Sequence, residues 1–167
     1  AVEESVVHDK AVESIVELVE TIPDHHITEH VVPMIERLGG ADWYTSRISA
    51  CNLICPAYAR LLESKDQESK SKQTLEAHLA LRKLFLGLCA DETPMVRRVA
   101  CSNLGTFVEL LPLEVVRDEL LGAFEKLAED DQDSVRLLSI DSCVALSNCF
   151  RVQQPDVCVQ RTVPLMF

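Results

Sequence analysis

Two histidines, His26 and His30, stand four residues apart, and acidic residues lie beside them at Asp24 and Glu29. On a helix this spacing places both imidazoles on one face, where they could hold a metal ion. The sequence alone fixes no third ligand for such an ion. A solvated helix start is therefore the favoured interpretation, and we predict neither a metal nor a cofactor.

The seven cysteines are the other candidates for metal or redox chemistry. Cys51 with Cys55, and Cys143 with Cys149, lack the CxxC spacing of metal and redox sites and fall on or near apolar stripes, which predicts packing in the core. The odd number of cysteines and the lack of a hydrophobic leader before them favour reduced thiols in an intracellular protein. We expect the protein in the cytoplasm, with the nucleus as a second compartment.

These residues do not provide a Ser-His-Asp grouping, a phosphate-binding glycine loop or a pair of carboxylates in a cleft. We therefore predict that the protein is not an enzyme. A metal-dependent helical enzyme remains the third alternative. The net charge of −11 disfavours binding to nucleic acids and to anionic membranes. The 167 residues, 47% of them apolar, suit one folded domain whose composition favours helices.

An internal sequence repeat predicts the secondary-structure elements that would position any functional site. Three arginines, Arg47, Arg97 and Arg136, each follow an acidic residue by five positions and precede a small residue by three. His8 takes the arginine's place in a fourth copy. The copies are spaced by 39 residues, except for one interval of 50 that contains an eleven-residue polar insertion at 63–73. The acidic and small partners of these four basic residues are Glu3 and Ala11, Asp42 and Ala50, Glu92 and Ala100, and Asp131 and Ser139.

Apolar residues at equivalent positions of the copies form two stripes with helical spacing, so each repeat is predicted to be a pair of helices. The second-helix stripe consists of Val12, Cys51, Cys101, Ile140, Ile15, Ile54, Leu104, Cys143, Leu18, Ala57, Phe107 and Leu146; the first-helix stripe consists of Val31, Leu81, Leu120, Ile35, Phe85, Phe124, Leu38, Leu88 and Leu127. The positions of the two stripes predict the second helix of a repeat at 5–21, complete helix pairs at 25–62, 75–110 and 114–150, and the first helix of a further repeat at 156–167. This single array, 1–167, is expected to be a fragment of a longer one.

Local signals refine these helices. Thr93 followed by Pro94 predicts a helix start, with the Thr93 hydroxyl as the capping group. Pro33 and Pro56 lie inside predicted helices and should bend them. Gly122 takes the position equivalent to Pro33 in a later copy, where a break in regular helix is also expected.

The turn sequences resemble a known family. The segments VVHDKAVES (6–14), GGADWYTSRISAC (39–51), DETPMVRRVA (91–100) and DDQDSVRLLS (130–139) are similar to consecutive HEAT repeats of the scaffold (A) subunit of protein phosphatase 2A. The resemblance implies an all-α, right-handed superhelix of antiparallel helix pairs. It implies a non-catalytic scaffold that binds a B-type regulatory subunit directly and holds the catalytic subunit through further C-terminal repeats, without nucleic-acid or membrane partners.

In this family, the turns inside the repeats form a ridge that touches the regulatory subunit. The resemblance carries this role to Glu3, Glu4, Asp42, Trp43, Tyr44, Asp91, Thr93, Pro94, Met95, Arg97, Arg98, Asp131, Gln132 and Ser134. The chain departs from the family pattern where His8 replaces an arginine and where the 63–73 insertion falls. A nuclear-transport HEAT receptor that binds a small GTPase or cargo is the alternative function.

Some of these residues have competing structural roles. The repeated arginines are expected to bind the acidic turns of their own or the next repeat, because a buried charge must be paired. Since Arg97 and Arg98 cannot both point into such a ladder, one of them should face a partner. Trp43 is either an exposed anchor or a ring folded over its own helix end. Met95 suits either a contact surface or a packing gap.

Overall fold

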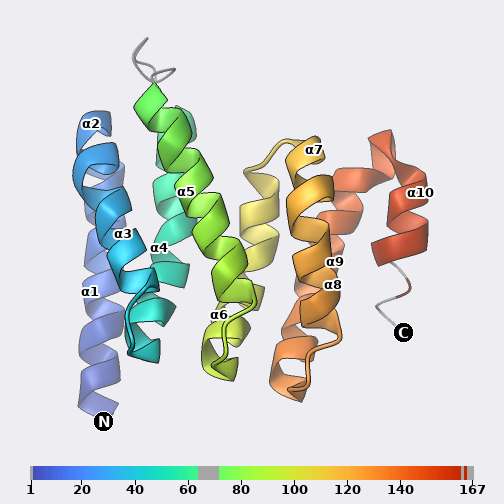
Figure 1. The fold of residues 1–167 in the computed structure, drawn as a ribbon, viewed down its shortest axis with the longest axis horizontal. Coiled ribbons are helices and arrows are strands. Elements are labelled where there is room, and N and C mark those ends of the chain that lie inside the picture. The colour runs from blue at the N-terminus through green and yellow to red at the C-terminus, as the bar shows by residue number, and fades with distance from the viewer. Residues whose placement is uncertain (1, 64–71, 163, 165–167) are drawn as a thin grey trace. The chain divides into compact units, whose positions relative to one another are not determined.

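The computed structural model describes residues 2–63, 72–162 and 164, and every regular element within them is helical. The prediction of an all-α solenoid is thereby confirmed. The chain divides into two compact units, Ala1–Phe85 and Leu86–Phe167. Figure 1 shows the helices within each unit lying side by side. None of the described helices is long and apolar enough to cross a bilayer.

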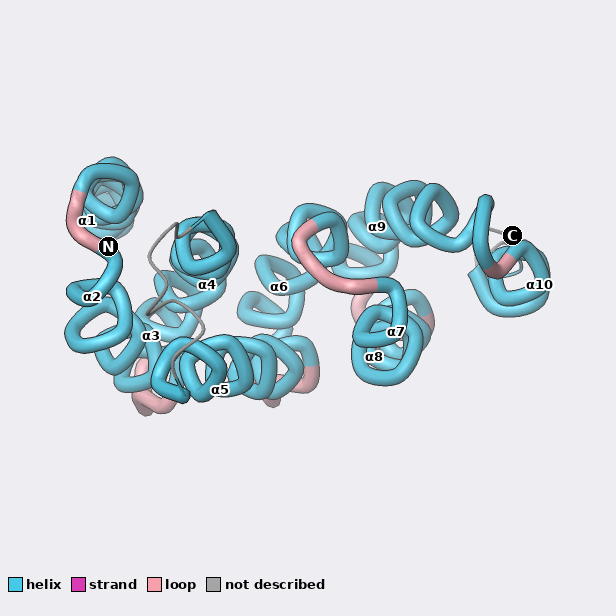
Figure 2. The backbone as a smooth tube through the Cα atoms, turned by 90° about the horizontal axis from the view of Figure 1, so that it is seen from above, coloured by secondary structure: helices cyan, strands magenta, loops and turns pink. Residues whose placement is uncertain are grey.

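The first unit is built around α4. Its elements are α1 (Val2–Thr21), α2 (Asp24–His26), the π-helical η1 (Ile27–Val31), α3 (Val32–Gly39), α4 (Tyr44–Glu63) and most of α5 (Lys72–Cys89). Helices α1 and α3 both pack against α4. Seen from above, α1 and α4 form one layer and the continuous rod α2–η1–α3 lies in the other (Figure 2). An ion pair of 2.7 Å between Arg60 and Asp24 joins α4 to α2.

The second unit repeats this arrangement around α9. Its remaining elements are α6 (Pro94–Glu109), α7 (Leu113–Val115), the π-helical η3 (Val116–Leu120), α8 (Leu121–Ala128), α9 (Asp133–Gln153), α10 (Pro155–Val157) and the π-helical η4 (Cys158–Thr162). Helices α6 and α8 pack against α9. Ser142 of α9 donates a hydrogen bond to the Cys101 carbonyl of α6 at 3.0 Å. Arg161 of η4 donates two bonds of 2.7 Å to the Glu125 carboxylate of α8.

Two of the three described π-helical segments lie where the sequence predicted a break, whereas η4 was not predicted and α4 runs through Pro56 as a continuous α-helix. The π-helical segment η1 ends two residues before Pro33, and η3 ends two residues before Gly122. Proline cannot donate its backbone hydrogen bond and its ring crowds the preceding turn, so a wider turn just upstream relieves the clash. Lys83 has the equivalent position in α5, where the helix stays regular.

The core consists of the two predicted stripes. All the first-helix positions are buried except Leu38, which is half-buried. Of the second-helix positions, Leu18 on α1 and Ile140 on α9 are exposed, against expectation, and Val12 and Ile15 are half-buried. The other eight are buried: Cys51, Ile54, Ala57, Cys101, Leu104, Phe107, Cys143 and Leu146. The apolar stripes therefore lie against neighbouring helices, as the helical period requires.

The cysteine pairs pack in the core, as predicted. Cys51, Cys55 and Cys143 are buried and Cys149 is half-buried. Burial raises the pKa of Cys55 to about 12, so this thiol stays protonated at neutral pH. A protonated, enclosed thiol is neither a nucleophile nor a metal ligand.

The helix bounds differ modestly from those predicted. Helix α1 starts three residues earlier than position 5, so Glu3 and Glu4 belong to its first turn and not to a joining bend. The side chains of both residues lie outside the described part of the chain, as does the insertion except for residues 63, 72 and 73. Of the predicted helix at 156–167, residues 163 and 165–167 are also outside it.

The stacking of α6 on the rest of its unit yields a stability prediction. Phe107 has no exposed surface, so Phe107→Ala should lower the free energy of unfolding by about 3–5 kcal/mol through lost burial and a residual cavity. Urea denaturation followed by circular dichroism measures the change. The matched control is Leu137→Ala at a mostly exposed position of α9, which should change stability by less than about 0.5 kcal/mol. Equal effects of the two substitutions would contradict this packing.

Candidate partner-binding turns

Each repeated arginine binds the backbone of the turn before its own helix. The Nη1 atom of Arg47 donates to the carbonyl oxygens of Ala41 and Asp42, at 2.9 and 2.8 Å. The equivalent atom of Arg97 donates to Asp91 and Glu92, at 3.0 and 3.3 Å. The first helix of each repeat ends at this turn, and a helix end leaves carbonyl groups without donors. The arginine supplies those donors and places its positive charge at the negative end of the helix dipole.

The third arginine repeats the contact. Nη1 of Arg136 donates to the Asp130 carbonyl at 2.6 Å, and its Nη2 binds the Asp133 carboxylate. Arginine binding to its own turn was predicted and is confirmed. The shared acceptors in all three copies are main-chain carbonyls and not the acidic side chains that marked the repeat.

Arg97 also binds the next turn along the chain. Its Nε donates to Asp130 Oδ2 at 2.7 Å, and its Nη2 donates to Asp130 Oδ1 at 2.9 Å and to Asp131 Oδ1 at 2.7 Å. The Arg97 side chain is 14% exposed and that of Asp130 is 6% exposed. A bidentate pair shielded from water in this way is among the stronger polar contacts in proteins. The turns at 91–93 and 130–132 are thus held at a fixed separation.

The dominant acidic partner is the one that the repeat pattern did not indicate. The pattern marks Asp131, whereas Asp130 carries the bidentate contact. Hydrogen bonding from Arg97 lowers the pKa of Asp130 to about 2, with further support from the Gln132 backbone N–H. The same hydrogen bond raises the pKa of Arg97. A signal was present in the sequence, because Asp91 and Asp130 are themselves 39 residues apart.

These two aspartates also shape the turns that precede the second helices. Asp91 Oδ1 accepts a hydrogen bond from the Thr93 backbone N–H at 2.8 Å, and Asp130 Oδ1 accepts the equivalent bond from Gln132 at 3.0 Å. Thr93 is the N-cap residue of α6 as predicted, but its side chain makes no capping hydrogen bond. The prediction of a hydroxyl cap is therefore wrong, because the carboxylate two residues earlier orders the turn instead.

The side chains at the tips of the turns face solvent. Trp43 is 76% exposed, so its ring is not folded over its own helix end. Tyr44 and Met95 are also exposed, and Asp91, Thr93 and Pro94 are half-buried. Of the two neighbouring arginines, Arg97 belongs to the ladder and Arg98 is exposed. The remaining predicted residues, Asp42, Asp131, Gln132 and Ser134, are exposed as well, together with Glu92 and Asp133, which the prediction omitted.

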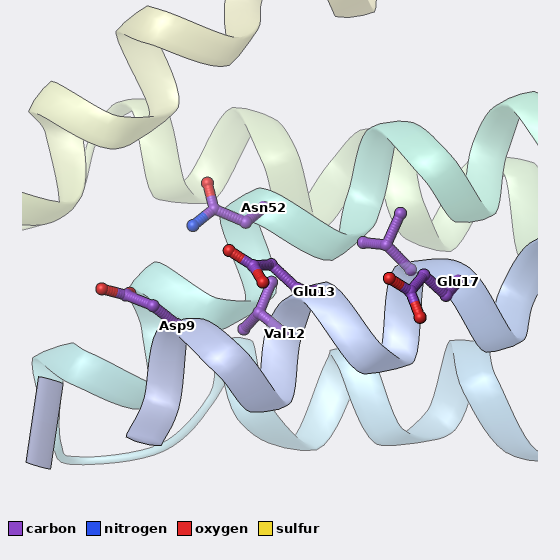
Figure 3. Close-up of a pocket in the computed structure, with 6 residues that line it drawn as sticks. Asp9, Val12, Glu13, Glu17 and Asn52 are labelled. Carbon is purple, nitrogen blue, oxygen red and sulfur yellow. The ribbon is translucent and has the colours of Figure 1, made fainter. Parts of the chain in front are cut away.

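A separate groove lies between α1 and α4 in the first unit. Asp9, Glu13 and Glu17 follow one another at four-residue intervals along α1 and line this groove together with Val12 and Val16 of the same helix and Asn52 of α4, and Glu13 lies beside Asn52 (Figure 3). Glu13 also binds Lys10 through an exposed ion pair of 2.7 Å. The groove is therefore acidic with an apolar component. The only feature of the sequence that could have indicated this groove is the i, i+4, i+8 spacing of its three carboxylates.

The contact between Arg97 and Asp130 predicts a specific pH dependence. Because the folded protein keeps Asp130 ionised to about pH 2, the unfolded chain binds its proton first as the pH falls below about 4. The contact should therefore contribute about 2 kcal/mol above pH 4, lost as the pH approaches 2. Urea denaturation at pH 6 and pH 2.5 should show a larger acid loss for the parent chain than for Asp130→Asn. The same acid loss in both proteins would refute the assignment.

Comparisons with known proteins agree with this architecture. A HEAT-repeat family model matches residues 81–111, which span the end of α5, the turn held by Arg97 and α6. The chain is 40% identical over 151 residues to the regulatory A subunit of protein phosphatase PP2A from Schizosaccharomyces pombe, covering 90% of this chain and 24% of the relative. It is 41% identical over 144 residues to a probable serine/threonine-protein phosphatase PP2A regulatory subunit of Caenorhabditis elegans, covering 86% of the chain and 22% of the relative.

A third relative is the protein phosphatase 2A scaffold subunit of Dictyostelium discoideum, 42% identical over 122 residues, or 73% of this chain and 19% of the relative. The chain thus spans a quarter or less of the length of these relatives. All three are named as regulatory or scaffold subunits and not as catalytic ones. The resemblance indicated by the turn sequences is confirmed: the chain is a HEAT-repeat protein homologous to part of the scaffold (A) subunit of protein phosphatase 2A.

Proposed function

We propose that the chain serves as a non-catalytic scaffold in a protein phosphatase 2A assembly and binds a regulatory subunit of the B type through its intra-repeat turns. The observation that carries this proposal is the 40% identity over 151 of the 167 residues to the regulatory A subunit of the fission-yeast phosphatase. The described turns supply the surface that the proposal requires. They present exposed aromatic, thioether, cationic and acidic side chains on a backbone that internal hydrogen bonds hold in place.

In the second unit, the different environments of Arg97 and Arg98 support the proposed binding of a regulatory subunit. Arg97 is engaged by two turns and fixes their separation, whereas Arg98 on the same helix is exposed. A surface ordered before binding loses less conformational entropy on association. Arg98 and Met95 therefore act as the contacting side chains, and Arg97 positions them.

In the first unit, Trp43 has the strongest case as a contact residue. Its ring is 76% exposed at the tip of a turn, and Arg47 binds the carbonyls of the two residues before it. Tryptophan and arginine are enriched among the residues that dominate binding energy at interfaces. An exposed indole on a well-ordered turn fits an apolar pocket of a protein partner.

The proposal predicts which variants lose a partner. Trp43→Ala and Arg98→Ala should each weaken capture of a purified B-type regulatory subunit by about tenfold or more, because interface anchors of these types contribute about 2 kcal/mol or more. Surface plasmon resonance with the immobilised chain measures the affinities. Circular dichroism should show unchanged helicity, since both side chains are exposed.

Arg151→Ala is the matched control for the arginine. Arg151 is also exposed on a second helix, but it lies in the last turn of α9, away from the intra-repeat turn that precedes that helix. This variant should retain parental affinity. Parental affinity in both turn variants would overturn the assignment of the turns, and retention of a small transport GTPase in place of the regulatory subunit would favour the nuclear-transport alternative. We expect no capture of the isolated catalytic subunit.

A further inference from the structure

The residues with metal-binding spacing lie in the first unit, at the opposite end of the α2–η1–α3 rod from Trp43. His26 is the last residue of α2, and Glu29 and His30 lie in η1. Residues at i, i+3 and i+4 share one face of a helix. The candidate ligand atoms of the three side chains all lie within 4.8 Å of one another. The structure therefore supplies the third ligand, Glu29, that the sequence pattern did not fix.

The two imidazoles lie close together on this face. The rings of His26 and His30 are stacked, with centroids 5.5 Å apart and an interplanar angle of 23°. Nδ1 of His26 is enclosed and makes no hydrogen bond among the described residues. A buried polar atom without a partner is costly, and ligation or a metal-ordered water would satisfy it. Glu29 and His30 are exposed, so an ion can reach the site from solvent.

Neighbouring charges leave this face available to a cation. Arg60, which reaches this end of the rod, is paired with Asp24 at 2.7 Å and also donates to the Ile22 carbonyl at 3.4 Å. Its positive charge is thus compensated by a carboxylate outside the cluster. The Arg60 ion pair with Asp24 therefore does not involve Glu29.

The donor set selects the class of ion. Two imidazoles and one carboxylate suit Zn²⁺ and its first-row neighbours, whereas Ca²⁺ and Mg²⁺ require oxygen ligands. Tetrahedral ligation at about 2.0–2.1 Å needs ligand atoms about 3.3 Å apart. Rotation of the exposed Glu29 and His30 side chains would bring the ligand atoms from within 4.8 Å to this shorter separation.

We propose that His26, Glu29 and His30 form a binding site for one Zn²⁺ ion, with water in the fourth position. The site is independent of the proposed scaffold function, because it uses none of the turn residues. An ion here would link α2 to η1, and its open coordination position would accept a ligand from solvent or from another molecule.

Titration calorimetry with Zn²⁺ alone, on the whole chain with reduced thiols, tests the site. The parent should bind one ion, and His30→Ala should lower the affinity by more than about tenfold, the scale of loss for even an outer-shell partner. Glu29→Gln should also weaken binding. His8→Ala is the matched control, because His8 is an exposed histidine of α1 outside the cluster, and this variant should bind as the parent does.

Substitution with Co²⁺ separates this site from the cysteines. Ligation by imidazole and carboxylate should give visible d–d bands without a thiolate charge-transfer band, and the bands should disappear in His30→Ala. The variant should keep its helicity by circular dichroism, since His30 is exposed. A thiolate band, equal affinities of His30→Ala and the parent, or a loss of binding in His8→Ala would each overturn the proposal.

Discussion

The hydrogen bonds from the Arg97 guanidinium to two successive turns are the interaction on which the order of the turns in the second unit depends. Burying a guanidinium is unfavourable unless its N–H groups find acceptors. Here Nη1 binds the carbonyls of Asp91 and Glu92, while Nε and Nη2 bind Asp130 and Asp131. The same side chain therefore closes the helix end of its own repeat and links it to the next. Without that link, each turn would be a separate loop with its own freedom to move.

The sequence predicted the helices well because their periodicity is a direct consequence of burial. Residues such as Phe85, Leu104 and Phe124 recur in phase since each faces a neighbouring helix. Leu18 and Ile140 share that phase but are exposed. They lie on α1 and α9 at surfaces that no other described residue covers. The periodicity of apolar residues shows which face of a helix they share. Whether that face is buried also depends on a neighbouring helix that covers it.

The polar details were harder to predict than the stripes, because several neighbouring side chains can perform the same task. Asp130 and Asp131 are adjacent acids, and only the backbone path of the turn decides which one meets Arg97 squarely. Thr93 is a good capping residue, but the Asp91 carboxylate already accepts its backbone N–H. Similarly, the spacing of His26 and His30 was visible in the sequence, while the position of Glu29 beside them depends on how the helix is wound. Residue types alone do not distinguish between such neighbouring side chains. The local backbone geometry determines which of them makes the contact.

The helix geometry that buries Arg97 also explains why the position after each repeated arginine can hold different side chains. Successive helical residues are rotated by about 100°, so the position after each ladder arginine points away from the ladder. That position holds Ile48, Arg98 and Leu137 in the three repeats, half-buried in the first and exposed in the other two. Arg47, Arg97 and Arg136 all donate to carbonyl oxygens of their own turns, and Arg97 also donates to carboxylates of the next turn. The next residue takes no part in these hydrogen bonds, so its type can differ between repeats without disturbing them.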